Sequence, residues 1–146
     1  AEPTKLFDGK SMDGWDYFVQ PSKDGKKVEL KDVWTVEDGY IKCGGKPNGY
    51  IITKQEFSDY ELRLKWRWAK GSKGGNSGVL LHVVGENKIW PKSIEAQLFA
   101  GSAGDFWLID NPKAEIDAKQ QDPKTPRHFF RTVKEGVEKE VGEWNE

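Results

Sequence analysis

Two stretches of sequence decide the fold: Gly74–His82, which reads GGNSGVLLH, and Ile94–Leu98, which reads IEAQL. In the first, a tight polar turn opens an apolar run, and the second carries a carboxylate and an amide two positions apart. Because side chains alternate across a strand, we expect Glu95 and Gln97 on one face, roughly 6–7 Å apart. Their apolar neighbours then point into a core. Two hydrogen-bonding groups side by side on a sheet face predict a site for a polar ligand such as a sugar.

The composition predicts one aromatic-rich domain that spans residues 1–146. The chain has 146 residues, enough to bury a single core, and it carries 7 Trp, 7 Phe and 4 Tyr. Its 23 basic and 24 acidic residues nearly balance, whereas nucleic-acid binding requires a basic surplus. No apolar run approaches the roughly 20 residues that a membrane span needs. We therefore expect no nucleic-acid partner and no membrane span.

Short alternating runs separated by turn residues predict an all-β fold. Val33–Val36 and Tyr40–Cys43 flank an Asp-Gly pair, which is a strong hairpin signal. Tyr60–Trp68 alternates apolar and charged residues throughout, as an antiparallel strand with one buried face does. Asn111–Gln121 has room for only a turn or two of helix before a proline. Many strands with almost no helix favour a β-sandwich or jelly roll.

A few residue types bear on the core and on metal binding. The single cysteine, Cys43, excludes an internal disulfide and a cysteine-based zinc site, and we expect it to be a small buried hydrophobe. The polar segment Lys113–Lys139 is predicted as a long excursion that contains His128. His82 and His128 are too far apart in sequence to form a metal motif. The tryptophans assigned to the core are Trp15, Trp34, Trp66 and Trp144.

Six motifs together resemble one known family. They are Leu6–Trp15 (LFDGKSMDGW), Trp34–Gly39 (WTVEDG), Phe57–Leu62 (FSDYEL), Gly75–Val79 (GNSGV), Ile94–Leu98 (IEAQL) and Gly142–Asn145 (GEWN). Each motif alone is weak, but they follow the family's order and cover nearly the whole chain. The chain resembles the 3-keto-disaccharide hydrolase family, formerly a domain of unknown function.

The resemblance implies a concanavalin A-like jelly-roll sandwich of two antiparallel sheets, the architecture of legume lectins and many glucanases. It also implies a secreted or periplasmic bacterial protein of saccharide metabolism, with its signal peptide removed. Members of the family are linked to cleavage of glycosides already oxidised at C3. Some are described as lyases and hydratases that act through a 2-hydroxyglycal.

Two departures from the family pattern stand out. Family members normally continue for several strands past the motif at Gly142–Asn145, so we expect closing strands to be missing from this sequence. His82 stands where relatives commonly carry Arg, which leaves the role of that position open.

The residues favour elimination over ordinary glycoside hydrolysis. A conventional glycosidase needs two carboxylates, but the strand that resembles the glucanase motif begins at Glu95 and has Gln97 at its middle. A 3-keto sugar removes this requirement because the ketone acidifies the C2 proton. One base, donors for the enolate oxygen and a donor for the leaving group then suffice. Glu95 is predicted as the base, and His82 as a group that donates or accepts a proton near neutral pH.

The remaining candidates are substrate-binding residues, each with a plainer alternative. We expect Gln97, Asn76 and Arg67 to hold hydroxyls and the enolate oxygen, and Trp90 and Trp107 to stack on sugar rings. The alternatives are a solvated sheet face for Glu95, Gln97 and Arg67, a strand-entry turn for Asn76, a satisfied sheet histidine for His82 and ordinary packing for the tryptophans.

No cofactor is predicted with certainty, and the pattern leaves open a divalent ion at Glu95. The leading interpretation is an enzyme that acts on 3-keto glycosides, by hydrolysis or by elimination followed by hydration. The main alternative is a non-catalytic carbohydrate-binding module, and a third is an interaction module in a larger surface assembly. Sequence does not predict the oligomeric state.

Overall fold

The computed structural model describes residues 2–146, which fall into two compact units. The first unit contains the chain up to Ser58 together with Asn87–Ile89. The second contains Asp59–Glu86 and Trp90–Glu146. Among the described residues, no helix is long and apolar enough to cross a membrane.

The first unit consists of two antiparallel strand pairs and one short helix. Its elements are β1 (Trp15–Val19), α1 (Leu30–Val33), β2 (Trp34–Glu37), β3 (Tyr40–Cys43) and β4 (Gly49–Thr53). Strand β1 pairs with β4, and β2 pairs with β3. The predicted hairpin is confirmed: Asp38 and Gly39 adopt φ of 48° and 79°, as a turn with two left-handed central residues requires.

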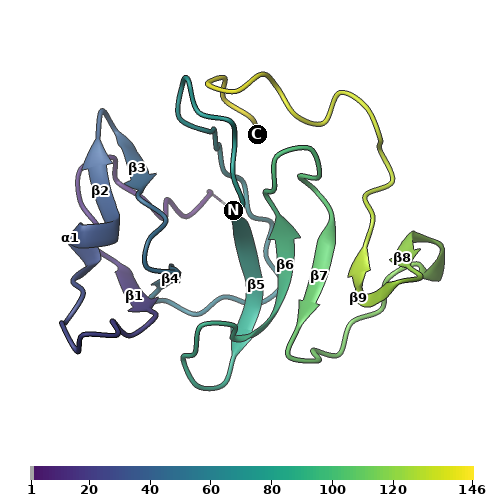
Figure 1. The fold of residues 1–146 in the computed structure, drawn as a ribbon, viewed down its shortest axis with the longest axis horizontal. Helices are drawn as coiled ribbons and strands as arrows, with labels where there is room; N and C mark the ends of the chain where they lie inside the picture. Colours follow the sequence, from purple (N-terminus) through teal and green to yellow (C-terminus); the bar gives the residue numbers. More distant parts are fainter. Residues whose placement is uncertain (1) are drawn as a thin grey trace. The chain divides into compact units, whose positions relative to one another are not determined.

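The second unit contains a five-stranded antiparallel sheet with the order β5-β6-β7-β9-β8 (Figure 1). Its elements are β5 (Gly78–Val84), β6 (Lys92–Gln97), β7 (Phe106–Ile109), the 3₁₀ turn η1 (Ala118–Gln120), β8 (Gln121–Asp122) and β9 (Thr125–Phe129). The prediction of an all-β fold with antiparallel sheets is thus confirmed. The architecture is consistent with a jelly-roll sandwich.

The register of this sheet gives it two different faces. Glu95 on β6 lies opposite Leu80 on β5 and Trp107 on β7, and Trp107 lies opposite His128 on β9. We call Glu95, Trp107 and His128 the polar row. On the other face the side chains of alternate residues line an apolar groove, whose residues include Leu62, Leu64, Trp66, Val79, Leu81, Ala96 and Leu98.

The prediction of a strand over Tyr60–Trp68 is wrong. This segment forms no ladder, and its only β-bridge within residues 2–146 joins Trp66 to Asn145. Trp66 and Asn145 exchange backbone hydrogen bonds of 3.0 and 2.8 Å, and Figure 1 shows the C-terminal segment returning toward this part of the second unit. The alternation therefore directs apolar side chains into the groove without the backbone pairing that defines a strand.

The core assignments of single residues are partly confirmed. Trp34 is buried, 5% exposed, whereas Trp144 is 37% exposed and Trp15 and Trp66 are partly buried. Cys43 is exposed, so the expectation that it is buried is wrong. Cys43 is the last residue of β3, which pairs only with β2. In so short a strand, the alternation of side chains does not determine which face of the ladder is buried.

Candidate functional site

Glu95 is the half-buried carboxyl of the polar row. It lies in the middle of the sheet, between β5 and β7, where neighbouring strands remove much of its surrounding water. Burial raises the pKa of this carboxyl above its ordinary value, and the positive charge of Arg127 lowers the pKa by a smaller amount. A carboxylate with a raised pKa is suited to accept a proton near neutral pH.

A glycine on the neighbouring strand makes room for this carboxyl. Gly78 on β5 lies under the side chain of Glu95, and a β-carbon at Gly78 would stand 2.7 Å from Cγ and 2.8 Å from Cδ of Glu95. Real β-carbons do not approach so closely, and the atoms in the way belong to the stem of the side chain as well as its end. The glycine is therefore required for the observed position of the carboxyl.

Gln97 and Asn76 lie next to each other at the end of the same face. Gln97 is buried, and its Nε2 lies 3.4 Å from Oδ1 of Asn76, the acceptor of a long hydrogen bond. The backbone of Gln97 accepts from Gly104 and donates to Asp105, at 2.8 and 2.9 Å. The structure thus brings together three predicted residues, Glu95, Gln97 and Asn76.

His128 forms a cluster that sequence reasoning left out of the site. Its Nε2 lies 2.8 Å from Oδ2 of Asp105, and its Nδ1 lies 3.1 Å from Oδ2 of Asp122. Both ring nitrogens face carboxylate oxygens, so both bonds form when the ring carries two protons. The ring also stacks on Trp107, with centroids 4.3 Å apart and planes 13° from parallel. These contacts fix the ring of Trp107 beside Glu95.

The two carboxylates of the cluster are themselves held by backbone amides. Oδ1 of Asp105 accepts from the amide of Arg131 at 2.9 Å. The amide of Lys124, and then the His128 side chain, hold the pKa of Asp122 below its ordinary value. The cluster is therefore preorganised from three separate segments of the second unit.

Arg127 reaches the same tryptophan from the neighbouring position on β9. Pairing between β7 and β9 ends at Trp107 and His128, so Arg127 lies beyond this ladder. Strand alternation therefore does not determine on which face of the sheet its side chain lies. Its Cζ lies 5.2 Å from the centroid of the Trp107 ring, within the range of a cation–π contact. Sequence reasoning missed Arg127 because it stood in the predicted excursion.

His82 does not join this group. It has a φ of 52° at an irregularity in β5, and its ring lies 5.1 Å from that of Tyr60. Both residues line the apolar groove, which also contains Leu81 and Ala96 but not Glu95. His82 and Glu95 therefore lie on opposite faces of the sheet.

The other predicted residues have separate environments. Arg67 contacts the C-terminal segment: its Cζ lies 4.6 Å from the Trp144 ring and its Nη1 donates to the carbonyl of Gly142 at 3.4 Å. Trp90 is 58% exposed, so its ring is accessible to a ligand. Trp107 is partly buried, and part of its ring is covered by His128.

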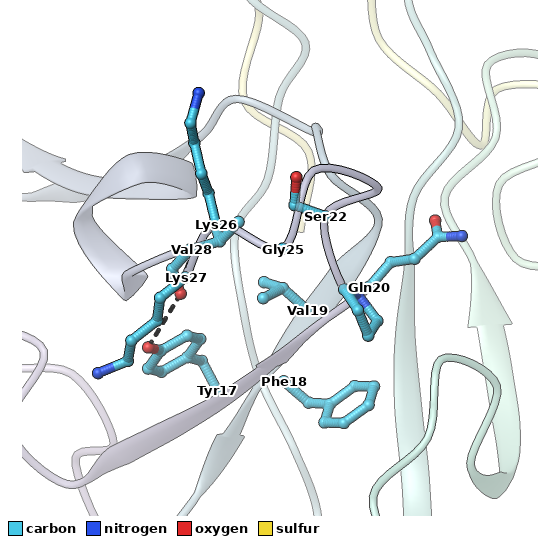
Figure 2. A pocket seen from close by; sticks show the side chains of 10 residues that line it. Tyr17, Phe18, Val19, Gln20, Ser22, Gly25, Lys26, Lys27 and Val28 are labelled. Carbon is cyan, nitrogen blue, oxygen red and sulfur yellow. Dashed lines mark hydrogen bonds between the residues drawn. The ribbon is translucent and has the colours of Figure 1, made fainter.

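Two hollows of the described units have lining residues that do not include Glu95 or Gln97. The first, of about 480 Å³, lies in the first unit between β1 and the loop that follows it (Figure 2). There the hydroxyl of Tyr17 donates to the carbonyl of Val28 at 3.2 Å. The second is the apolar groove.

The sequence left a divalent ion at Glu95 open, and the residues that the structure describes around Glu95 offer no ready donor set for one. Within residues 2–146, no three His, Cys, Asp or Glu side chains are grouped so that they would hold a metal ion. Arg127, whose charge acts on Glu95, is a cation rather than a ligand. The described residues around Glu95 therefore do not fit a metal.

The fold and the polar row define an all-β protein with a half-buried carboxyl on a sheet face. Comparison with known families gives a match over residues 2–146 to the family described as "3-keto-alpha-glucoside-1,2-lyase-like domain". The chain belongs to this family, as the resemblance in its motifs predicts.

One relative in Bacteroides thetaiotaomicron is described as a 3-keto-disaccharide hydrolase. It is 28% identical over 154 residues, and the alignment covers 96% of this chain and 49% of the relative. The chain thus spans about half the length of this relative. No solved structure matches the chain.

Proposed function

We propose that this chain cleaves 3-keto glycosides and that Glu95 is the base that removes the C2 proton. The single observation that carries the proposal is the half-buried carboxyl of Glu95, which has a raised pKa and lies over Gly78 on the neighbouring strand. The family match and the name of the Bacteroides relative support the class of substrate.

The reaction follows from the acidity that a C3 ketone confers on C2. Glu95 takes the C2 proton, and the electron pair of the C2–H bond moves toward C3 as an enolate. Return of this pair forms the C1–C2 double bond and breaks the bond from C1 to the glycosidic oxygen. The leaving oxygen takes the proton back from protonated Glu95, so the step balances, and the product is a 2-hydroxyglycal that keeps the C3 ketone. Addition of water across the double bond then gives the free 3-keto sugar, so elimination plus hydration equals hydrolysis.

In this proposal, Gln97 and Asn76 assist substrate binding at the end of the sheet face that carries Glu95. The exposed Asn76 presents its amide to sugar hydroxyls near Glu95, and the buried Gln97 positions Asn76 by donating from Nε2 to Oδ1 of Asn76. His82 has no part in it, because it lies on the apolar face. Arg67 has none either, because its guanidinium contacts Trp144 and Gly142.

A carbohydrate-binding module is the second candidate, and the exposed ring of Trp90 favours it. Incubation with a 3-keto disaccharide separates the two functions. Cleavage releases a free monosaccharide and passes through an enone that absorbs in the ultraviolet. A binding module leaves the disaccharide intact and shows only saturable affinity.

The test of the base compares Glu95→Gln with the wild type and with Glu86→Gln, in which an exposed carboxyl of the β5–β6 loop is changed instead. We expect Glu95→Gln to lose at least about 10²-fold in turnover, as removal of a general base does. Equal turnover in all three proteins would exclude Glu95 as the base.

A secreted or periplasmic location is also proposed, on the resemblance to the family alone. Fractionation of cells that express the full-length gene tests it. Recovery of the protein in the cytosolic fraction would overturn it.

A further inference from the structure

Arg127 is an exposed cation on β9. Within residues 2–146 its guanidinium makes no hydrogen bond or ion pair, and its Cζ lies 5.2 Å from the centroid of the Trp107 ring. A guanidinium has five N–H donors. Those of Arg127 are therefore open to solvent or to a ligand.

Trp107 provides a fixed position for this cation. Its ring is stacked on His128, which is bonded to Asp105 and Asp122 at its two nitrogens. The side chain of His128 is only 12% exposed. Because His128 holds the Trp107 ring in position, the guanidinium of Arg127 above that ring has a defined position as well.

The same tryptophan is the direct neighbour of the proposed base. Trp107 lies opposite Glu95 in the ladder between β6 and β7. The charge of Arg127 lowers the pKa of the Glu95 carboxyl, and its guanidinium lies over the ring of Trp107. A proton acceptor and an unused hydrogen-bond donor thus share one aromatic neighbour.

This inference rests on the proposed function. We infer that Arg127 is a further catalytic residue, whose guanidinium donates to the C3 oxygen of the 3-keto sugar. As the proton moves from C2 to Glu95, the electron pair moves into the C2–C3 bond and the C3 carbonyl oxygen becomes negative. Arg127 stabilises that oxygen until the pair returns and the C1 oxygen leaves.

Other candidates for this role are already occupied. Nε2 of the buried Gln97 lies against Asn76, and both nitrogens of His128 face carboxylates. His128 is therefore a positioning residue, because it acts on the substrate only through Trp107.

Three variants of this chain test the inference: Arg127→Met, Arg127→Lys and, as a matched control, Lys124→Met, an exposed cation on the turn between β8 and β9. The readouts are kcat and KM with a 3-keto disaccharide, and deuterium uptake at C2 of 3-keto-glucose in D₂O. Arg127→Met should lower kcat and C2 exchange together by about 10²–10³-fold, with a much smaller change in KM. Arg127→Lys should recover part of both, and Lys124→Met should match the wild type.

Two results would overturn the inference, and they differ. If the wild type cleaves the disaccharide and Arg127→Met stays within about threefold of it, Arg127 has no such role while the proposed function stands. If the wild type neither cleaves the disaccharide nor exchanges the C2 proton, the proposed function fails and this role fails with it. Far-UV circular dichroism of each variant confirms that losses arise in a folded protein.

Discussion

Glu95 lies across Gly78, on the adjacent strand, so closely that any β-carbon at that position would overlap its side chain. A β-carbon at Gly78 would stand 2.7 Å from Cγ of Glu95 and 2.8 Å from its Cδ. The carboxylate of Glu95 thus explains why the last residue of the GNSG motif is glycine. The turn at Asn76 and Ser77 does not enter this explanation. This pair links the two stretches of sequence that decide the fold.

Replacing Gly78 with alanine should reduce activity far more than stability. The new methyl group forces the Glu95 carboxyl to move, and a misplacement of about 1 Å costs about 10²-fold in rate. The measurement is kcat on a 3-keto disaccharide, alongside urea unfolding. Gly44→Ala is the matched control, because a β-carbon at Gly44 meets only a carbonyl oxygen at 3.6 Å. Unchanged kcat in Gly78→Ala would show that the carboxyl position does not matter.

In the pH profile of kcat/KM, the midpoint of the acid limb should lie above 4.5, the ordinary pKa of a glutamate side chain. Burial raises the pKa of Glu95, and only the deprotonated form accepts a proton, so kcat/KM should rise with pH through this raised pKa. Arg127 lowers the pKa of Glu95, so Arg127→Met should shift the limb further toward high pH. A limb at or below 4.5 in the wild type would contradict this assignment.

The same shift makes stability depend on pH in a defined direction. Since the folded pKa of Glu95 is raised, the folded state binds more protons than the unfolded state between pH 4.5 and the raised value. The free energy of unfolding should therefore fall as pH rises through this interval, and Glu95→Gln should remove that part of the decline. Urea titrations at several pH values measure it, and parallel curves for the two proteins would refute the expectation.

His128→Ala should destabilise the second unit by roughly 2 kcal/mol. The change removes the stack on Trp107 and leaves oxygens of Asp105 and Asp122 without their partner. Urea unfolding checks this, with Lys124→Ala as the control on the adjacent turn. An unchanged midpoint would mean that the cluster contributes nothing to stability.

His82→Ala should leave activity within about twofold of the wild type. His82 lines the apolar groove with Tyr60, on the face opposite Glu95, so its loss leaves the polar row intact. Steady-state turnover of a 3-keto disaccharide measures it. A tenfold or greater loss of kcat would return His82 to the catalytic group.

Local signals in the sequence predicted the parts of the fold that depend on neighbours in the chain. The Asp38-Gly39 turn and the alternation of Glu95 with Ala96 are such features, because turn chemistry and the period of two operate over a few residues. The strand over Tyr60–Trp68 was predicted wrongly because strand formation also depends on residues distant in the chain. A ladder needs a partner strand, and the sequence does not show whether one is supplied.

The polar row could be predicted only in part. Strand alternation placed Glu95 and Gln97 on one face, but the pairing that brings Trp107 and His128 beside Glu95 joins segments more than ten residues apart. Strand β9 was hidden by Pro126 and by polar neighbours, since proline within a run argues against a strand. Phe129, its last residue, and the following Phe130 are the aromatic signal that favours a strand here.

Proton exchange at C2 of 3-keto-glucose in D₂O, followed by proton NMR, tests the central claim most directly, because it detects the first chemical step without a leaving group. We expect rapid loss of the C2 signal with the wild type and with Glu86→Gln. With Glu95→Gln, the rate of C2 exchange should be at least about 10²-fold lower. Equal exchange by the wild type and Glu95→Gln would contradict the assignment of Glu95 as the base.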